Sequence, residues 1–453
     1  MEGGYVHFTK EMKKTHTILI PNMAPLQFSI LQAALEREGY HTEVLGNCGS
    51  QVAQLGLKYV HNDTCYPALL VIGQFLDALN SGKYDLEHTA LLITQTGGGC
   101  RASNYIHLLR KALAKAGYGS IPVASLNFSG LEKDSGFQMS LPMLKMALAA
   151  IVYGDLLMTL RNQTAPYELE KGAAEALAQK WVKTIRGWFL QGRGGSAKEM
   201  KAAFPGIAKE FAAIPVKRTP KVKVGVVGEI YVKYSPLGNN GLEAFLAGEG
   251  CEVNLPGLLG FVQYCVSNMG DTVRLYGGSG ALVWGAEALL KHMDGIEQAS
   301  ISALRAAGYH APARFLDLRN MADGIISRGN KMGEGWLLTA EMVELVTSGY
   351  ENIVCAQPFG CLPNHICGKG MINKIRTIYP RANITPIDYD PGATRVNQEN
   401  RIKLMLSVAK ERLGQSGGTP PQGGAAEKVP VYGGMEVPAV HVPGFAEKLP
   451  ANG

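Results

Sequence analysis

Residues 94–101 read TQTGGGCR and residues 355–363 read CAQPFGCLP, so Cys100 and Cys361 lie in two similar glycine-containing loops. Each loop follows a short apolar run and precedes a stretch with the composition of a helix. This order predicts that each cysteine follows the carboxyl end of a parallel β-strand, where open α/β sheets bind ligands. Cys65 lies in a third loop of this kind, residues 61–67 (HNDTCYP).

Strand-like and helix-like stretches alternate on either side of these loops. Residues 17–21 predict a strand, residues 28–38 a helix and residues 41–45 a second strand. A similar order begins again at Val222. Alternation of this type is typical of parallel sheets covered by helices on both faces. We therefore expect two similar α/β domains that face each other and direct their strand-end loops towards one cleft.

The composition divides the chain into five expected segments. Residues 138–213 have helical spacing of apolar side chains, and the last forty residues are rich in glycine and proline. The expected segments are a loose leader (1–14), a first α/β domain (15–137), a mostly helical linking element (138–215), a second α/β domain (216–412) and a disordered tail (413–453).

The totals exclude several classes of protein. The 453 residues carry a formal net charge of +6, and their lysines and arginines are dispersed, so nucleic-acid binding is not indicated. The N-terminus lacks the apolar core of a secretory signal. The apolar tract 143–160 is interrupted by Lys145 and Asp155, which predicts a buried helix rather than a membrane span. These features predict a cytoplasmic protein whose eight cysteines are reduced thiols.

Thiols at strand ends of such a chain indicate a metal or iron–sulfur site. Residues 97–99 (GGG) free the backbone to direct N–H groups towards sulfur, and Arg101 adds positive charge that favours a thiolate. Ligands drawn singly from separate loops suit a cluster held between domains. The sequence contains no Cys-x2-Cys pair, which argues against a ferredoxin-type cluster and a zinc ribbon.

The eight cysteines differ in how well they fit a ligand role. Cys65, Cys100 and Cys361 are the best candidates, and Cys355 is the next, although Cys355 also fits a buried structural residue of an apolar strand. Cys48 and Cys367 are weaker candidates, and the remaining two, Cys251 and Cys265, lie in apolar stretches typical of a core. The glycine-rich residues 277–280 (GGSG) lack the Lys-Ser/Thr of a phosphate-binding loop, so we expect no nucleotide site in this chain.

Three stretches resemble the 2-hydroxyacyl-CoA dehydratase superfamily, with further likeness to the C-terminal region of acyl-CoA dehydratase activase-related proteins and to double-cubane cluster proteins. The stretches are residues 59–68 (YVHNDTCYPA), 94–105 (TQTGGGCRASNY) and 357–365 (QPFGCLPNH). Residues 387–393 (IDYDPGA) and 396–404 (VNQENRIKL) add to the resemblance, which runs from about residue 16 to 412. The large relatives carry an activase domain in the same chain, and we expect none within these 453 residues.

The resemblance implies flavodoxin-like domains around a 4Fe–4S cluster or a double-cubane 8Fe–9S cluster, with Cys65, Cys100, Cys361 and then Cys355 at the ligand positions. It further implies a component that accepts electrons and reduces substrate in an ATP-dependent reductase or dehydratase of anaerobic metabolism. A separate ATP-hydrolysing iron–sulfur activator would deliver the electrons, and relatives imply a homodimer or a heterodimer with a related subunit. Two alternatives remain open: a 2-hydroxyacyl-CoA dehydratase subunit, and a non-catalytic cluster carrier or scaffold for maturation of another metalloenzyme.

Overall fold

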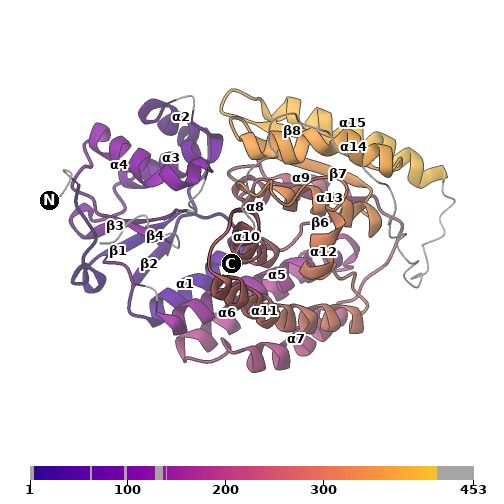
Figure 1. The fold of residues 1–453 in the computed structure, drawn as a ribbon, viewed down its shortest axis with the longest axis horizontal. Helices are drawn as coiled ribbons and strands as arrows, with labels where there is room; N and C mark the ends of the chain where they lie inside the picture. The colour runs from indigo at the N-terminus through magenta and orange to yellow at the C-terminus, as the bar shows by residue number, and fades with distance from the viewer. Residues whose placement is uncertain (1–4, 62–63, 96–98, 128–135, 139, 416–453) are drawn as a thin grey trace, which may run out of the picture.

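The computed structural model describes residues 5–61, 64–95, 99–127, 136–138 and 140–415. It contains two four-stranded sheets in which all paired strands are parallel (Figure 1). The expected α/β fold with two parallel-sheet units is therefore confirmed. The expected disorder of the tail falls on residues outside this range, apart from the last turn of the final helix.

The two sheets have the same strand order, which explains the repeated sequence pattern. The first sheet has the order β2-β1-β3-β4 and the second has the order β6-β5-β7-β8. In each sheet the strand order reverses between the first and the third strand of the unit, and ligands bind at such switch points. The strands are β1 (Thr17–Ile20), β2 (His41–Val44), β3 (Thr89–Gln95), β4 (Val123–Asn127), β5 (Lys223–Gly228), β6 (Glu252–Asn254), β7 (Asn352–Pro358) and β8 (Asn383–Tyr389).

The helices of the first unit pack closely because small residues lie where they cross. A Cβ atom on Gly73 would lie 2.0 Å from the carbonyl oxygen of Val52, so α2 and α3 approach at backbone contact. The helices are η1 (Met12–Lys14), α1 (Pro25–Arg37), α2 (Ser50–Tyr59), α3 (Tyr66–Asn80), η2 (Leu86–His88), η3 (Arg101–Asn104) and α4 (Tyr105–Ala116).

The described residues before β1, residues 5–16, are packed rather than loose, contrary to expectation. Phe8 is buried in a cluster on one face of the first sheet, and its carbonyl oxygen accepts a hydrogen bond from the backbone of Gly136 at 2.9 Å. His7 forms an isolated parallel bridge with Val123 of β4. The aromatic side chain at position 8 therefore anchors the N-terminal segment to the sheet.

A group of helices joins the two units through one continuous core. The long helix α5 (Leu141–Thr164) contacts α1, α6, α7, α10 and β6. It is the one helix in the described residues that is long and apolar enough to cross a membrane, but 61% of its most apolar window is buried, as in the core of a soluble protein. The neighbouring elements are η4 (Ala165–Tyr167), α6 (Ala173–Leu190) and α7 (Ala197–Ala212).

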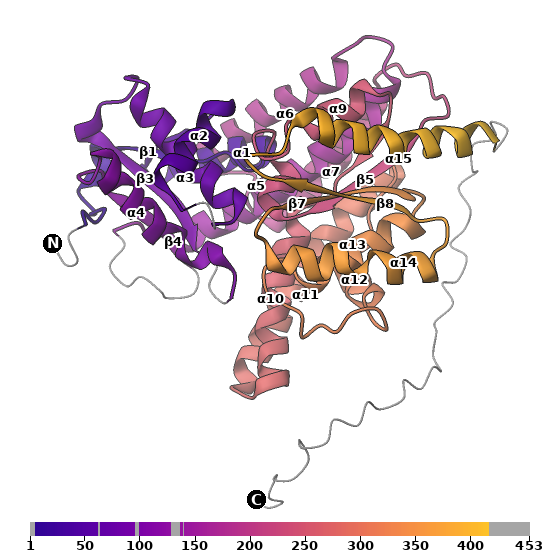
Figure 2. The ribbon, with the colours of Figure 1, turned by 90° about the horizontal axis from the view of Figure 1, so that it is seen from above.

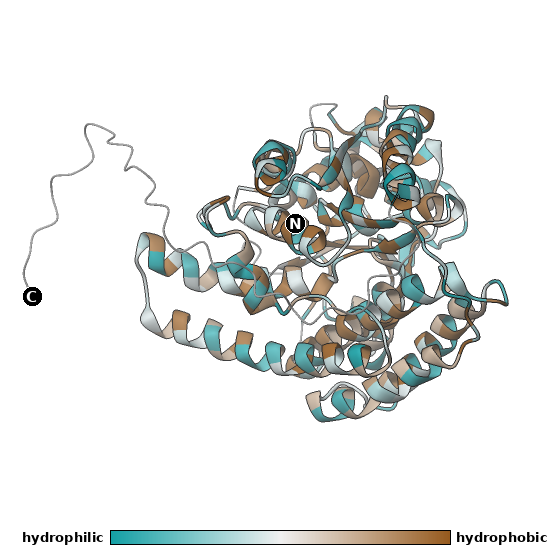
Figure 3. Ribbon diagram, turned by 90° about the vertical axis from the view of Figure 1, so that its right-hand side faces the viewer, coloured by the Kyte–Doolittle hydropathy of each residue, from teal (hydrophilic) through white to brown (hydrophobic). Residues whose placement is uncertain are grey.

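The second unit carries an additional run of helices between β6 and β7. The long helices α10 (Leu258–Tyr276) and α11 (Gly280–Ala306) form a hairpin whose tip projects from the body (Figure 2). Surface helices alternate hydrophilic and hydrophobic segments along the ribbon, as amphipathic helices do (Figure 3). The remaining elements are α8 (Ile230–Tyr234), α9 (Leu242–Gly248), α12 (Phe315–Met321), α13 (Trp336–Thr347), η5 (Asn364–Gly368), η6 (Lys369–Met371), α14 (Ile372–Ile378) and α15 (Arg395–Gln415).

Candidate functional site

Cys100 follows the carboxyl end of β3 and immediately precedes η3, which leads into α4. Gln95, the last residue of β3, stabilises the end of this loop. Its side-chain nitrogen donates to the carbonyl oxygen of Ser103 at 3.1 Å, and its oxygen accepts from the Ser125 hydroxyl at 2.6 Å. The strand end and the start of the helix are thus linked beside the thiol.

Cys361 occupies the corresponding position in the second sheet, after the carboxyl end of β7. Its backbone N–H donates to the carbonyl oxygen of Pro358 at 3.3 Å, and its sulfur accepts a hydrogen bond from the Asn364 side chain at 3.3 Å. Asn364 begins η5, a short π-helix. Such π-helical turns are rare and occur frequently at functional sites.

Cys65 directly precedes α3, and its loop touches the Cys361 loop of the other unit. The backbone N–H of Tyr66 donates to the carbonyl oxygen of Phe359 at 3.2 Å. Gly360 has φ +75°, and a Cβ atom there would lie 3.4 Å from the Cα of Cys65. The Cys65 sulfur lies 2.9 Å from the Tyr105 hydroxyl. These contacts bring the loops of Cys65 and Cys361 together at the junction of the two sheets.

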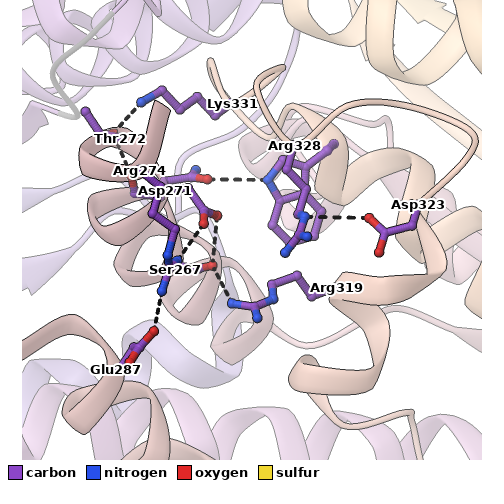
Figure 4. A network of polar contacts seen from close by, with 11 residues as sticks. Ser267, Asp271, Thr272, Arg274, Glu287, Arg319, Asp323, Arg328 and Lys331 are labelled. Carbon is purple, nitrogen blue, oxygen red and sulfur yellow. Dashed lines mark hydrogen bonds and ion pairs between the residues drawn. The ribbon is translucent and has the colours of Figure 1, made fainter. Parts of the chain in front are cut away.

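A third segment, the connection between α12 and α13, contacts the Cys100 loop at the junction. The backbone N–H of Gly99 donates to the sulfur of Met332 at 3.3 Å, which joins the Cys100 loop to the connection between α12 and α13. Polar contacts attach this connection and α12 to α10, through Lys331 with Thr272 and through Arg319 with Ser267 (Figure 4).

Two carboxylates that the sequence patterns did not single out also lie at the junction. Glu229 follows β5, and its side chain accepts from the backbone N–H of Val232 at 2.8 Å. Glu334 is 6% exposed and accepts from the backbone N–H of Ile230 at 3.0 Å and from the Asn364 side chain at 2.9 Å. Asn364 therefore donates both to Glu334 and to the Cys361 thiol.

Burial and these carboxylates disfavour free thiolates at the junction. Burial raises the pKa of Cys100 to about 11, and the charges of Glu334 and Glu229 act in the same direction. Burial also raises the pKa of Cys65 and of Cys361, and the carboxylates add to the effect. The expected effects are present but outweighed by burial: the hydrogen bond from the Ala102 backbone lowers the pKa of Cys100, and the charge of Arg101 lowers that of Cys65. The thiols would ionise only with a strong positive partner such as a metal centre, because metal binding displaces the thiol proton.

The other candidate cysteines lie apart from this arrangement or in different surroundings. Cys355 is fully buried in a hydrophobic cluster on one face of the second sheet, and its pKa of about 12 reflects burial and then Asp388. Cys367 is buried within η5, and Cys48 is exposed after β2. Cys251 is buried as predicted, whereas Cys265 is exposed on α10 and does not belong to the expected core.

The spacing of these groups bears on which cofactor fits. Within the described residues, no group of three or more His, Cys, Asp or Glu side chains is arranged to hold a single metal ion. The thiols of Cys65, Cys100 and Cys361 come from three separate loops around one junction, and the buried oxygen of the Asn364 side chain has no hydrogen-bond partner. A cluster of several irons, which takes one thiolate at each of several irons, fits three separated thiols better than one ion does.

No known family model matches this sequence, and no curated protein matches it either.

Proposed function

We propose that this chain is an iron–sulfur protein that accepts low-potential electrons and reduces a substrate within an ATP-dependent two-component reductase or dehydratase system. The observation that supports this proposal most directly is that the three loops that carry Cys65, Cys100 and Cys361 lie around the junction of two matching parallel sheets. A 4Fe–4S cluster or a double-cubane cluster would take these thiolates as ligands and would supply the electron-accepting centre. Cys355 is a less favoured ligand, because its side chain packs in the core.

The surface beside Cys361 fits a separate electron donor. Phe359, Leu362 and Ile366 are 56%, 69% and 46% exposed, although apolar side chains gain free energy when they leave water. A small apolar surface next to the thiols suits a transient interface through which electrons reach the junction. We propose that an ATP-hydrolysing activator with its own cluster docks here, in the cytoplasm, and that two such chains or related subunits form a dimer.

The non-catalytic alternative is a scaffold or carrier that assembles a cluster for another metalloenzyme. Burial of the thiols favours a resident cluster, because a carrier has to present its cluster to the acceptor protein, and Cys65 is only 6% exposed. A 2-hydroxyacyl-CoA dehydratase subunit remains the second enzymatic candidate. Substrate trials with acyl-CoA thioesters distinguish that candidate from a reductase of small molecules.

Anaerobic purification tests the cofactor. We expect brown protein with about four or about eight irons per chain, depending on the cluster type, and matching acid-labile sulfide. Colourless protein with one zinc per chain would overturn the proposal.

Single substitutions test the ligand set. Cys65→Ala, Cys100→Ala and Cys361→Ala should each lose or convert the cluster, because alanine cannot replace a thiolate ligand. Cys251→Ala is the control, because Cys251 is buried like Cys65 but lies beside β6, and its iron content should equal that of the wild type. Full iron content in all three junction variants would contradict the assignment, and loss of iron in Cys355→Ala would add that residue to the ligands.

Electron delivery separates the enzymatic proposal from the scaffold. The isolated chain should not hydrolyse ATP, and its cluster should be reduced at physiological potential only with an activator and ATP. Robust ATPase activity of the chain alone would contradict the two-component system. Transfer of the whole cluster to an apo-protein acceptor, without reduction by any activator, would favour the scaffold.

A further inference from the structure

Glu229 and Glu334 are held at the junction by the same short segment of backbone. Glu229 accepts from the N–H of Val232, and Glu334 accepts from the N–H of Ile230, so both carboxylates cover the start of α8. Gly335, with φ +46°, follows Glu334, and a Cβ atom there would lie 2.1 Å from the carbonyl oxygen of Asn330. The backbone that places Glu334 beside Glu229 therefore requires glycine.

The surroundings give this pair little compensation for two negative charges. Within the described part of the chain neither carboxylate forms an ion pair, and Lys233, whose charge favours ionised Glu334, is already bound to both oxygens of Glu341 at 3.0 Å. The other titratable side chains that interact with the pair are thiols and phenols from several elements and loops. They are Cys65, Cys100, Cys361, Cys265, Cys367, Tyr105, Tyr231 and Tyr264.

We propose that Glu229 and Glu334 share one proton and together form the acid group of the junction, which stores a proton for the reaction that occurs there. Their arrangement supports this assignment, because two neighbouring carboxylates in a poorly hydrated site do not both ionise near neutral pH. Burial, followed by the charge of Glu334, raises the pKa of Glu229 to about 8. Burial likewise raises the pKa of Glu334. Glu229 is the more exposed of the two and is thus the member that exchanges protons with water.

The role of the stored proton in a reaction rests on the proposed function. The sharing of one proton between Glu229 and Glu334 does not. When the low-potential donor delivers one electron to the junction, the added negative charge raises the proton affinity of the pair. The pair then takes one proton from water or buffer and forms an O–H bond on the ionised carboxyl, so the charge of the junction is unchanged. That proton is then available to a reduced substrate, and the pair returns to its starting state.

The first test uses the protein without any cluster. The infrared C=O band of protonated carboxyl groups, followed from pH 5 to pH 10, should show a step near pH 8 in the wild type. Glu229→Gln keeps an oxygen that accepts from Val232 and so preserves the helix start. In this variant the step near pH 8 should disappear. The pKa of Glu334 should be more than about one pH unit lower than in the wild type, because the negative charge of Glu229 is absent. An unchanged titration in Glu229→Gln, or no step near pH 8 in the wild type, would overturn the shared proton.

The matched control is Glu344→Gln. Glu344 is another buried carboxyl, whose pKa burial raises to about 7, but it accepts from the backbone of Ala313 and lies outside the junction. Its replacement should remove a separate step near pH 7 and leave the step of the pair in place. Loss of the step near pH 8 in Glu344→Gln would assign that step to Glu344 and contradict the proposal.

The second test uses cluster-loaded protein and asks whether the pair follows the electron. The reduction potential of the wild type should fall by about 59 mV per pH unit, the value for one proton per electron, over the range in which the pair titrates. Glu229→Gln should give a flat dependence, and Glu344→Gln should match the wild type. A flat wild-type potential together with a positive infrared result would refute the reaction role and keep the shared proton. If the wild-type protein binds no cluster, the proposed function is refuted, but the shared proton is not, because the infrared test uses protein without a cluster.

Discussion

Lys233 and Glu341 form a buried ion pair in the second unit, and the charge of Lys233 compensates the buried carboxylate of Glu341. Both side chains are about 5% exposed, and the ammonium group lies 3.0 Å from each carboxylate oxygen. Lys233→Met removes the cation and leaves Glu341 buried without its partner. Breaking a buried pair in this way costs about 3–5 kcal/mol. We expect urea unfolding at pH 8 to show a loss of this size, measured as the change in midpoint multiplied by the m-value.

The pH dependence of the loss follows from the direction of the pKa shift. Burial raises the pKa of Glu341, and Lys233 opposes this shift. Without Lys233 the folded-state pKa rises further, so the penalty is full at high pH and decreases as the pH falls and Glu341 takes up a proton. The destabilisation should therefore be smaller at pH 5 than at pH 8. Adding Glu341→Leu to the variant should recover most of the loss, because no buried charge then remains.

A surface pair provides the control. Lys180 and Glu210 lie 2.9 Å apart, but their side chains are 63% and 43% exposed. Lys180→Met should cost no more than about 1 kcal/mol, because water and salt screen exposed pairs. Equal losses for Lys233→Met and Lys180→Met would refute the reasoning, as would a loss for Lys233→Met that grows towards low pH.

Two further predictions concern the described core. Glu344 has a folded-state pKa of about 7, above its unfolded value, so its contribution to wild-type stability should decrease as the pH rises from 4 to 7. In urea unfolding, the loss of stability between pH 4.5 and pH 8 should be smaller in Glu344→Gln than in the wild type by about 3 kcal/mol. Equal losses in the two proteins would contradict this prediction. Gly73→Ala should lower the melting temperature strongly, because its Cβ would overlap the Val52 carbonyl oxygen, whereas Gly206→Ala in α7 has open space and should stabilise by about 0.5–1 kcal/mol. Equal melting temperatures for the two alanine variants would show that α2 and α3 separate at little cost.

Much of the fold was predictable because it rests on short-range patterns. Apolar runs that end in glycine loops predicted both sheets, and the repeat of this pattern predicted two similar units. The run of helices between β6 and β7 interrupts the second repeat and was not predicted. Phe8 was assigned to a loose leader, because one aromatic residue among polar neighbours gives no periodic signal.

The candidate site was predictable only in part. Cysteines in strand-end loops are visible in the sequence, and three of them lie around the junction. Glu229 and Glu334 are more than a hundred residues apart, and their proximity depends on how β5 and the connection before α13 pack together. The one available signal was Gly333-Glu334-Gly335, since both glycines have positive φ and such a backbone holds a side chain in a fixed place. Cys265 was assigned to the core because apolar periodicity does not show which face of a long surface helix is covered.

The distribution of the junction along the chain constrains its biosynthesis. The first sheet is complete when β4 ends at Asn127, but the loop of Cys361 emerges from the ribosome only after β7. At about 5–20 residues per second, roughly 10 to 50 s separate these two events. During that interval Cys65 and Cys100 are synthesised without their partner loop. On the proposed function, cluster insertion would therefore follow synthesis of the Cys361 loop, and the nascent thiols would need protection from premature iron or oxygen until the second unit has folded against the first.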